Sequence, residues 1–324
     1  MMQPGEPILR LEAVRRTFGT VTAVEGLDLE VAEGELFGLL GPNGAGKTTA
    51  IRMVCGELPC DSGRILLRGQ VLRSDTAHRH LVGWCPQEIV IWKQLGCLEQ
   101  LTLIGRLYGM NRVAASHRGL DLLTELGLDN QRATLGGNLS GGMQRRLNIA
   151  LALMHDPPLV ILDEPGAGLD PAGRVLVRRL IRSLARNRTV LLTTHEMDEA
   201  ERLCDRIAIM DHGVLLAHDT VDGLRRTTGG EQIIELRFAT PEPGNAPSGR
   251  TSAERAAEQL IAMNGFHLRH HGATLTIGCA DPPSALPAVL QRLAEVGLSP
   301  DEIRLRQPSL EDVFLHLTGE KVRS

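Results

Sequence analysis

A continuous apolar stretch, Leu36–Leu40, runs directly into the glycine-rich segment Gly41–Thr48. Such a stretch predicts a strand in the middle of a sheet, because a strand covered on both faces needs no polar side chains. The segment fits the pattern G-x-x-x-x-G-K-[ST], and residues 48–55 predict a helix after it. In this context the backbone N–H groups point inward toward an anion, beside the positive end of the helix. The three elements therefore constrain the chain to an α/β fold with a phosphate-binding loop.

The loop residues are expected to bind the phosphates of a nucleotide, and they are Gly41, Pro42, Asn43, Gly44, Ala45, Gly46, Lys47, Thr48 and Thr49. We expect the Lys47 ammonium to reach the outer phosphates and the Thr48 hydroxyl to coordinate Mg²⁺. On its own the loop indicates only a nucleoside triphosphatase. The chain has no Asn-Lys-x-Asp motif, which would read guanine, and this disfavours a GTPase.

A second apolar stretch, Leu159–Leu162, ends in the adjacent carboxylates Asp163 and Glu164. Carboxylates in this position lie at the edge of the sheet where the buried strand ends. One of the two can hold the Mg²⁺ shell. The other can lie close to the water that attacks the terminal phosphate and polarise it as a general base. A carboxylate that caps a helix or lies in a surface turn is the structural alternative. Two carboxylates with different roles therefore predict hydrolysis, not binding alone.

The stretch Leu139–Gln144 begins with Leu-Ser-Gly-Gly and predicts a helix that starts after Ser140. The Ser140 hydroxyl and the free N–H groups of Gly141 and Gly142 form a second anion-binding helix end. One nucleotide does not need two such sites from one compact domain. The second site is explained if it closes over the nucleotide of a second copy. Taken alone, the stretch is also consistent with an ordinary capped helix.

Together these motifs resemble those of the nucleotide-binding subunits of ABC transporters, and the resemblance extends over residues 8 to about 225. It implies an α/β fold, the P-loop NTPase ABC cassette, with a mixed sheet core, N-terminal antiparallel strands and a helical insertion at about 95–155. It also implies ATP and Mg²⁺ as cofactors. The chain departs from its relatives at Gly166, where Thr is common, and over 91–98, where a membrane subunit would dock.

Further residues match family elements in order. Gln87 matches a glutamine that touches magnesium and water, and His195 matches a histidine that contacts the terminal phosphate. Gly168–Asp170 matches a loop that crosses the dimer interface. Phe18 matches the aromatic residue that stacks on adenine, although relatives usually carry Tyr and a core Phe is the alternative. The resemblance thus assigns catalysis to Glu164, His195 and Gln87, magnesium binding to Thr48, Gln87 and Asp163, and nucleotide binding also to Phe18, Ser140, Gly141, Gly142 and Gln144.

The remaining pattern predicts the organisation of the sheets. Residues 8–38 predict strands with turns at Gly19, Gly26 and Gly34. Residues 159–162 and 189–193 predict buried strands, and the helical pattern 171–184 between them completes a βαβ unit.

We predict an ATP-binding cassette over 1–228 and a small α+β accessory or regulatory domain over 229–324. Around a proline-rich loop at 241–250, the second domain has the strand and helix order of a ferredoxin-like domain. Its predicted elements are strand 233–239, helix 252–263, strands 266–270 and 273–279, helix 285–296 and strand 301–306. The tail 307–315 resembles an extension found in drug and polysaccharide export subunits, and Ser309 is expected to cap a short amphipathic helix there.

Composition limits the partners. A net charge of −4 and a pI near 6.3 give no support for a nucleic-acid-binding surface. The six cysteines have no metal-ligand spacing, and no apolar run approaches the roughly 20 residues that span a bilayer. Since the chain has no spanning run, the resemblance to ABC transporter subunits implies a peripheral protein on the cytoplasmic face of the cell membrane. It also implies two partners, a separate permease and a second copy of this or a related ATP-binding subunit, and no nucleic acid is expected.

The predicted function is the ATP-hydrolysing motor of an exporter, in which a dimer of cassettes drives a substrate through the permease. The alternative is a soluble ABC-type ATPase that acts on nucleic acid or ribosomes. Such proteins usually carry two cassettes, a coiled-coil insertion or zinc cysteines. This chain has one phosphate loop, one Leu-Ser-Gly-Gly motif, no long heptad run and no zinc spacing.

Overall fold

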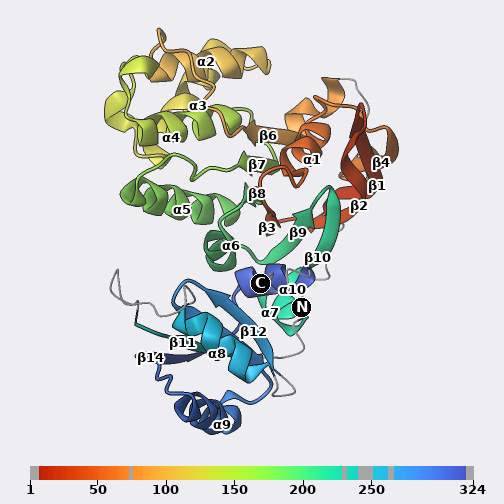
Figure 1. Ribbon diagram of the computed structural model, residues 1–324. Helices are drawn as coiled ribbons and strands as arrows, with labels where there is room; N and C mark the ends of the chain where they lie inside the picture. The colour runs from red at the N-terminus through yellow and green to blue at the C-terminus, as the bar shows by residue number, and fades with distance from the viewer. Residues whose placement is uncertain (1–6, 73–75, 228–231, 240–250, 262–265, 319–324) are drawn as a thin grey trace, which may run out of the picture. The chain divides into compact units, whose positions relative to one another are not determined.

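The computed structural model describes residues 7–72, 76–227, 232–239, 251–261 and 266–318. The chain divides into two compact units, Met1–Thr220 and Val221–Ser324 (Figure 1). The predicted loop at 241–250 lies outside the described residues. Within the described ranges, no helix is both long and apolar enough to cross a membrane.

The first unit begins with an antiparallel sheet in the order β2-β1-β4-β5. Its strands are β1 (Pro7–Phe18), β2 (Val21–Ala32), β4 (Ser62–Leu67) and β5 (Gln70–Val71). The predicted turn at Gly26 is wrong, because Gly26 lies inside β2. The register with β1 shifts between the pairs Val14–Leu27 and Arg16–Val24, and Gly26 has φ +59°. Gly26 therefore forms a bulge, which uses the left-handed backbone that glycine adopts readily.

The central sheet has the order β10-β9-β3-β8-β7-β6. Its strands are β3 (Leu36–Leu40), β6 (Val82–Cys85), β7 (Leu159–Asp163), β8 (Thr189–Thr194), β9 (Arg206–Asp211) and β10 (Val214–Thr220). All neighbours are parallel except β9 and β10. Every residue of β3, β7 and β8 is buried, as continuous apolar strands predict. The helices of this layer are α1 (Lys47–Val54), α5 (Pro171–Ala185) and α6 (Met197–Leu203).

One apolar core joins the antiparallel sheet, α1 and a face of the central sheet. Leu27 and Val31 of β2, Ile51 of α1 and Phe37 of β3 are all buried in it. The glycine loop therefore leaves β3 and enters α1 between two rigid layers, so its position is set by packing on both sides.

A helical insertion follows β6 and precedes β7. It contains α2 (Cys97–Leu107), α3 (Arg112–Glu125) and α4 (Gly141–Ala152), with 3₁₀ turns at Asp129–Gln131 and Gly136–Asn138. A further 3₁₀ turn, Thr76–Leu81, precedes β6. Leu101, Leu122, Leu123 and Leu147 are fully buried and form the apolar interior of the insertion. Figure 1 shows these helices, in yellow and green, as one group.

The second unit contains α7 (Val221–Arg226), β11 (Gln232–Arg237), α8 (Ser252–Leu260), β12 (His267–His271), β13 (Thr274–Cys279), α9 (Pro282–Glu295), β14 (Glu302–Arg306) and α10 (Leu310–Leu317). Its antiparallel sheet has the order β12-β13-β11-β14. The first and third strands of the βαββαβ run are thus the central pair, as in a ferredoxin-like fold. The predicted cap is present, since Ser309 Oγ accepts a hydrogen bond from Asp312 N at 3.3 Å.

Candidate active site

Four parallel strands end at the same edge of the central sheet, and each delivers a predicted site residue there. The glycine loop follows β3, Gln87 follows β6, Asp163 and Glu164 end or follow β7, and His195 follows β8. Ligands of open α/β sheets bind at this carboxyl edge. The fold therefore brings together residues that lie up to 154 positions apart in the sequence, from Gly41 to His195.

The glycine loop has a backbone that only glycine can supply at two positions. Gly41 has φ +154°, and a Cβ there would lie 2.2 Å from the Met210 carbonyl oxygen. Gly46 has φ +99°, and a Cβ there would lie 2.3 Å from the Ala23 carbonyl oxygen. These close approaches seat the loop between β9 and β2. Its shape is therefore fixed before any ligand arrives.

Lys47 is buried at the first turn of α1, and its ammonium lies inside the loop. Nζ donates to the carbonyl oxygens of Gly41 at 2.7 Å and Pro42 at 3.0 Å, and lies 4.0 Å from Glu164 Oε1. Burial lowers the pKa of Lys47, while the carboxylates of Glu164 and Asp163 oppose that shift. A phosphate entering the loop would find a poorly hydrated cation already in place.

Asp163 lies beside two hydroxyl groups. Its Oδ2 accepts from Thr48 Oγ1 at 3.3 Å, and its Oδ1 accepts a short hydrogen bond from Thr193 Oγ1. Thr193 is the direct neighbour of Asp163 across β7 and β8. Its role was not predicted from the sequence, since the contact depends on the order of the strands.

Glu164 faces His195. Either oxygen of the Glu164 carboxylate is within 3.0 Å of His195 Nδ1. The carboxylate is nearly buried, whereas the His195 side chain is 47% exposed. The Glu164 backbone has φ +47°, and its N–H donates to both the carbonyl and the hydroxyl oxygen of Thr193 at 3.1 Å. A left-handed backbone is strained for a glutamate, and strain of this kind is concentrated at functional sites.

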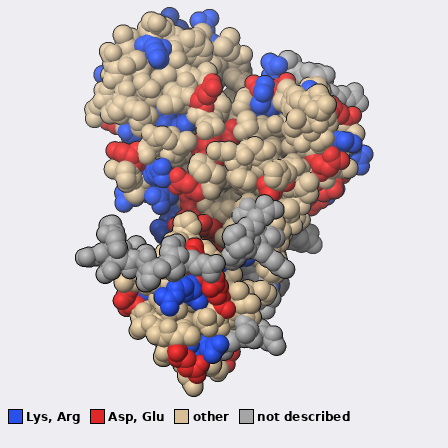
Figure 2. Space-filling model, in the orientation of Figure 1, with Lys and Arg blue, Asp and Glu red and all other residues tan. Residues whose placement is uncertain are grey.

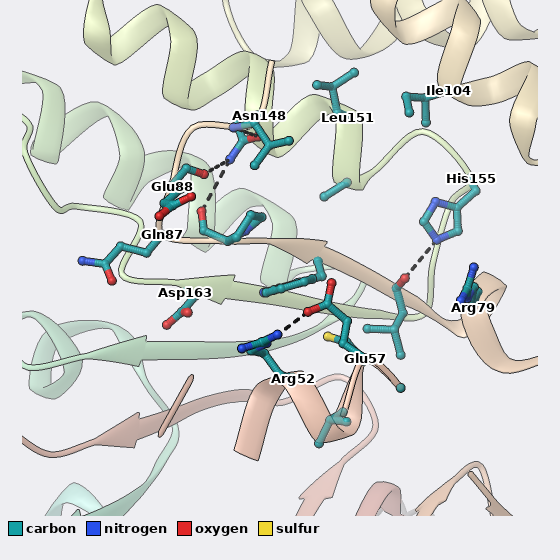
Figure 3. Close-up of a pocket in the computed structure, with 18 of the residues that line it drawn as sticks. Arg52, Glu57, Arg79, Gln87, Glu88, Ile104, Asn148, Leu151, His155 and Asp163 are labelled. Atoms are coloured by element: carbon teal, nitrogen blue, oxygen red, sulfur yellow. Dashed lines mark hydrogen bonds and ion pairs between the residues drawn. The ribbon is translucent and has the colours of Figure 1, made fainter. Parts of the chain in front are cut away.

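Gln87 has an exposed side chain at the start of the connection from β6 to the insertion. The close-up in Figure 3 shows it near Asp163 and beside Glu88. Its carbonyl oxygen accepts from Arg145 Nη2 at 2.6 Å. The backbone of Gln87 is therefore held by α4, while its amide remains free to reach into the site.

Ser140, Gly141, Gly142 and Gln144 lie at the start of α4. Ser140 Oγ accepts from Met143 N at 3.3 Å, and a Cβ at Gly141 or Gly142 would meet nothing within 4 Å. Gln144 Nε2 donates to the carbonyl oxygens of Gly136 and Leu139. No hydrogen bond within the described ranges joins these residues to the glycine loop. The helix end is thus open on its outer side.

Phe18 lies at the end of β1, and the residue is 44% exposed. The Arg16 guanidinium stands 4.8 Å from the ring centroid and pairs with Asp61 at 2.8 Å. Arg16 thus holds the ring from one side and leaves part of it open. This exposure argues against the alternative of a core Phe.

The loop after Glu164 is shaped by glycine and by a helix cap. Asp170 Oδ1 accepts from Gly173 N at 2.7 Å at the start of α5. A Cβ at Gly166 would lie 3.3 Å from Glu199 Oε2. Burial is the largest influence on Glu199 and raises its pKa. Glycine at position 166, where relatives commonly carry Thr, thus leaves space beside the buried Glu199 carboxylate.

A groove of about 800 Å³ lies between the sheet and the helical insertion (Figure 3). Trp84, Val90, Trp92 and Tyr108 line it, and the Tyr108 ring stacks on His155 with centroids 3.9 Å apart. Gln87, Thr48 and Asp163 also line it. One end of the groove is therefore continuous with the candidate site.

A family model described as ABC transporter matches residues 24–167. The daunorubicin resistance ATP-binding protein DrrA3 of Streptomyces coeruleorubidus is 38% identical over 97% of both chains. The linearmycin resistance ATP-binding protein LnrL of Bacillus subtilis is 35% identical over 98% of this chain and 100% of its own. The Nod factor export ATP-binding protein I of Rhizobium sp. (strain N33) is 40% identical over 96% of this chain and 97% of its own.

Solved structures agree with these relatives. An ATP-binding subunit of an ABC transporter superposes with a TM-score of 0.62 at 29% identity, covering 68% of this chain and 93% of its own. An ATP-binding cassette of an ABC transporter in its ADP conformation gives a TM-score of 0.60 at 26% identity, covering 67% of this chain and 92% of its own.

Proposed function

Because the chain belongs to the ABC transporter family, as an ATP-hydrolysing subunit of the kind that powers exporters, we propose that it works as a dimer on the cytoplasmic face of a membrane. Two copies close over two ATP molecules and drive a separate permease. The observation that carries this proposal is the convergence of Lys47, Asp163, Glu164 and His195 at one edge of the sheet.

The residues of the site fit Mg²⁺. This ion prefers hydroxyl, carboxylate and phosphate oxygens, and Thr48 Oγ1 and Asp163 Oδ2 lie 3.3 Å apart at the mouth of the loop. We assign Thr48, Asp163 and the exposed amide of Gln87 to the metal shell. When bound, the ion would neutralise charge that develops on the phosphate oxygens. Lys47 and the loop N–H groups add positive charge around the same phosphates.

Glu164 and His195 supply the proton chemistry. The Glu164 carboxylate accepts a proton from the attacking water, and its near-complete burial makes that acceptor poorly hydrated. A carboxylate can only accept hydrogen bonds, so His195 Nδ1 carries a proton in this pair. The pair therefore fits a site in which His195 binds phosphate while Glu164 activates water.

The second half of each site is proposed to come from the partner copy. The start of α4, at Ser140–Gly142, has an open outer side and free N–H groups, so it can bind phosphate from outside its own unit. Phe18 would stack on adenine in the same copy as Lys47. Each ATP is thus enclosed by the glycine loop of one copy and Ser140, Gly141 and Gly142 of the other.

A cross-linking experiment tests this arrangement. Asn43→Cys and Asn138→Cys, both at exposed positions, are combined in a Glu164→Gln background that retains ATP. We expect a covalent dimer only with ATP present and only when both cysteines are present. Each single-cysteine variant is the control for the native cysteines. Failure of the double variant to cross-link with ATP would remove the composite site.

The groove beside Gln87 is proposed to receive the permease. It exposes aromatic and aliphatic side chains next to a residue that we assign to the metal shell, so a partner seated there could sense the nucleotide. The relatives named for drug resistance and Nod factor export support export as the direction. The second unit, and the helix α10 that Ser309 caps, are proposed to stabilise or regulate the dimer.

Two matched valines test the docking surface. Val90 lines the groove and is 58% exposed, whereas Val113 on α3 is outside it and is 66% exposed. The chain is co-expressed with a candidate permease, chosen as the product of a neighbouring gene that has about six apolar spans of roughly 20 residues. Val90→Asp is expected to lower co-purification about tenfold, the equivalent of about 1.4 kcal/mol, and Val113→Asp to leave it unchanged. Equal recovery of both variants would place the permease elsewhere. Recovery with ribosomes or DNA, and never with membranes, would favour the nucleic-acid alternative.

A further inference from the structure

The segment from Pro86 to Val90, which carries Gln87, follows β6 and belongs to no helix or strand. Two side chains of α4 bind its backbone instead. Arg145 donates to the carbonyl oxygens of Pro86 at 2.9 Å and Gln87 at 2.6 Å. Asn148 donates to the Glu88 carbonyl at 3.3 Å and accepts from Val90 N at 3.2 Å. Figure 3 shows Asn148 reaching this segment from the helix above it.

Burial of the charged Arg145 side chain is energetically unfavourable. The residue is only 2% exposed, and no carboxylate in the described part of the chain forms an ion pair with it. Its Nε has no hydrogen-bond partner in the structure. A buried charge without an opposite charge destabilises a fold, and an apolar side chain of similar volume is often the more stable choice. The burial of the guanidinium is therefore explained by the groups that it binds. These are the backbone carbonyl groups of Pro86 and Gln87, one on either side of the Gln87 Cα atom.

Ser140 caps the start of the same helix. Arg145 lies five positions further on, or roughly 7.5 Å along the helix axis. Because a helix moves as a rigid body over that length, a displacement of Ser140 also displaces the carbonyl groups that Arg145 holds. The structure thus contains a direct mechanical link between the two ends of the proposed composite site.

We propose that Arg145 and Asn148 are positioning residues that lock the Gln87 segment to the helix bearing Ser140. Closure of Ser140 over the nucleotide of one copy then sets Gln87 at the nucleotide of its own copy. This inference rests on the proposed function, because it assumes that both Ser140 and Gln87 act on ATP. Neither Arg145 nor Asn148 touches the reacting atoms.

A double-mutant cycle on the full-length chain tests the link. Arg145→Met keeps the length of the side chain and removes its donors, and Gln87→Ala removes the amide that it positions. If Arg145 acts through Gln87, each single change lowers kcat by up to about 10²-fold, the effect of a misplacement of about 1 Å. The double variant then stays within about threefold of Gln87→Ala, because the two effects do not add. Arg145→Met also raises the Mg²⁺ concentration required for half-maximal turnover, which a purely structural role would not change.

Arg118 provides the matched control. It lies at the other end of the same helix, where Nη2 contacts the Leu153 carbonyl oxygen at 3.4 Å and pairs with Asp156 Oδ1 at 2.9 Å, and its Nε also lacks a partner. Arg118→Met should leave the Mg²⁺ requirement unchanged, and its effect on kcat should multiply with that of Gln87→Ala. If Arg145→Met multiplies in the same way, the link does not exist.

A second variant covers the possibility that Arg145→Met does not fold. Asn148→Ala removes the contacts to Glu88 and Val90 and leaves Arg145 in place. It should show the same lack of additivity with Gln87→Ala, and full additivity would overturn the proposal. The outcome is distinct from failure of the proposed function. If Glu164→Gln hydrolyses ATP normally, the site itself is wrong, whereas additivity in the cycle removes only the role of Arg145 and Asn148.

Discussion

Glu164→Gln is expected to bind ATP and to hydrolyse it about 10²- to 10⁴-fold more slowly than the native chain. Glutamine keeps the shape of the side chain and its contact with His195, but it cannot take a proton from water. The buried surroundings of Glu164 strengthen the effect, because no bulk water is at hand to replace the missing base. Single-turnover hydrolysis of ATP, measured with a parallel nucleotide-binding assay, separates the lost chemistry from any loss of affinity.

Loss of the neighbouring carboxylate, that of Asp163, should affect activity in a different way. Asp163→Asn alters an oxygen assigned to Mg²⁺, so it should raise the Mg²⁺ concentration required for activity before it changes the chemical step. Glu33→Gln, on a surface glutamate paired with Arg68 at 2.7 Å, serves as the control for a Glu→Gln substitution.

Near-native turnover in Glu164→Gln would show that another group acts as the base.

Lys47→Ala should abolish ATP binding at ordinary nucleotide concentrations. The ammonium is the only side-chain cation that the structure places inside the glycine loop among the described residues, and it donates to the carbonyl oxygens of Gly41 and Pro42 in that loop. Loss of one partner from a buried charge pair costs about 2–5 kcal/mol, which corresponds to an increase in Kd of roughly 30- to 5,000-fold. Isothermal titration with ATP and Mg²⁺ measures this change directly.

Stability has to be followed in the same variant. The alanine leaves Glu164 without the cation 4.0 Å away and leaves the carbonyl groups of Gly41 and Pro42 without a donor. Thermal unfolding without nucleotide therefore provides the control: a folded Lys47→Ala chain that fails to bind ATP supports the assignment. A folded variant with native affinity would show that the loop alone holds the phosphates.

Much of the fold could be predicted from local patterns. The strand Leu36–Leu40, the helix after the glycine loop and the buried strand before Asp163 follow directly from apolar runs and their flanking residues. The strand order of the second unit agrees with the predicted order of elements. Gly26 was mistaken for a turn because glycine marks turns and bulges alike, and only the pairing of β1 with β2 distinguishes them.

The site residues that were missed all act through contacts distant in sequence. Thr193 meets Asp163 only because β7 and β8 are neighbours, which no local pattern reveals. Arg145 and Asn148 bind a segment almost 60 positions earlier. A signal did exist in the sequence, since both polar residues share a face of α4 that otherwise packs inward. A charge at an inward-facing helix position indicates a specific partner, even where that partner is unknown.

The backbone strain at Glu164 and the contacts of its side chain act on folding stability in opposite directions. A residue with a side chain loses about 1–3 kcal/mol when it is held in a left-handed conformation, and glycine would relieve most of that loss. Glycine would also leave the buried Lys47 ammonium without the carboxylate 4.0 Å away, and removal of one partner from a buried charge pair costs about 3–5 kcal/mol. The ion pair therefore offsets the strain, so the carboxylate assigned to the reaction is also the group that makes this backbone conformation tolerable to the fold.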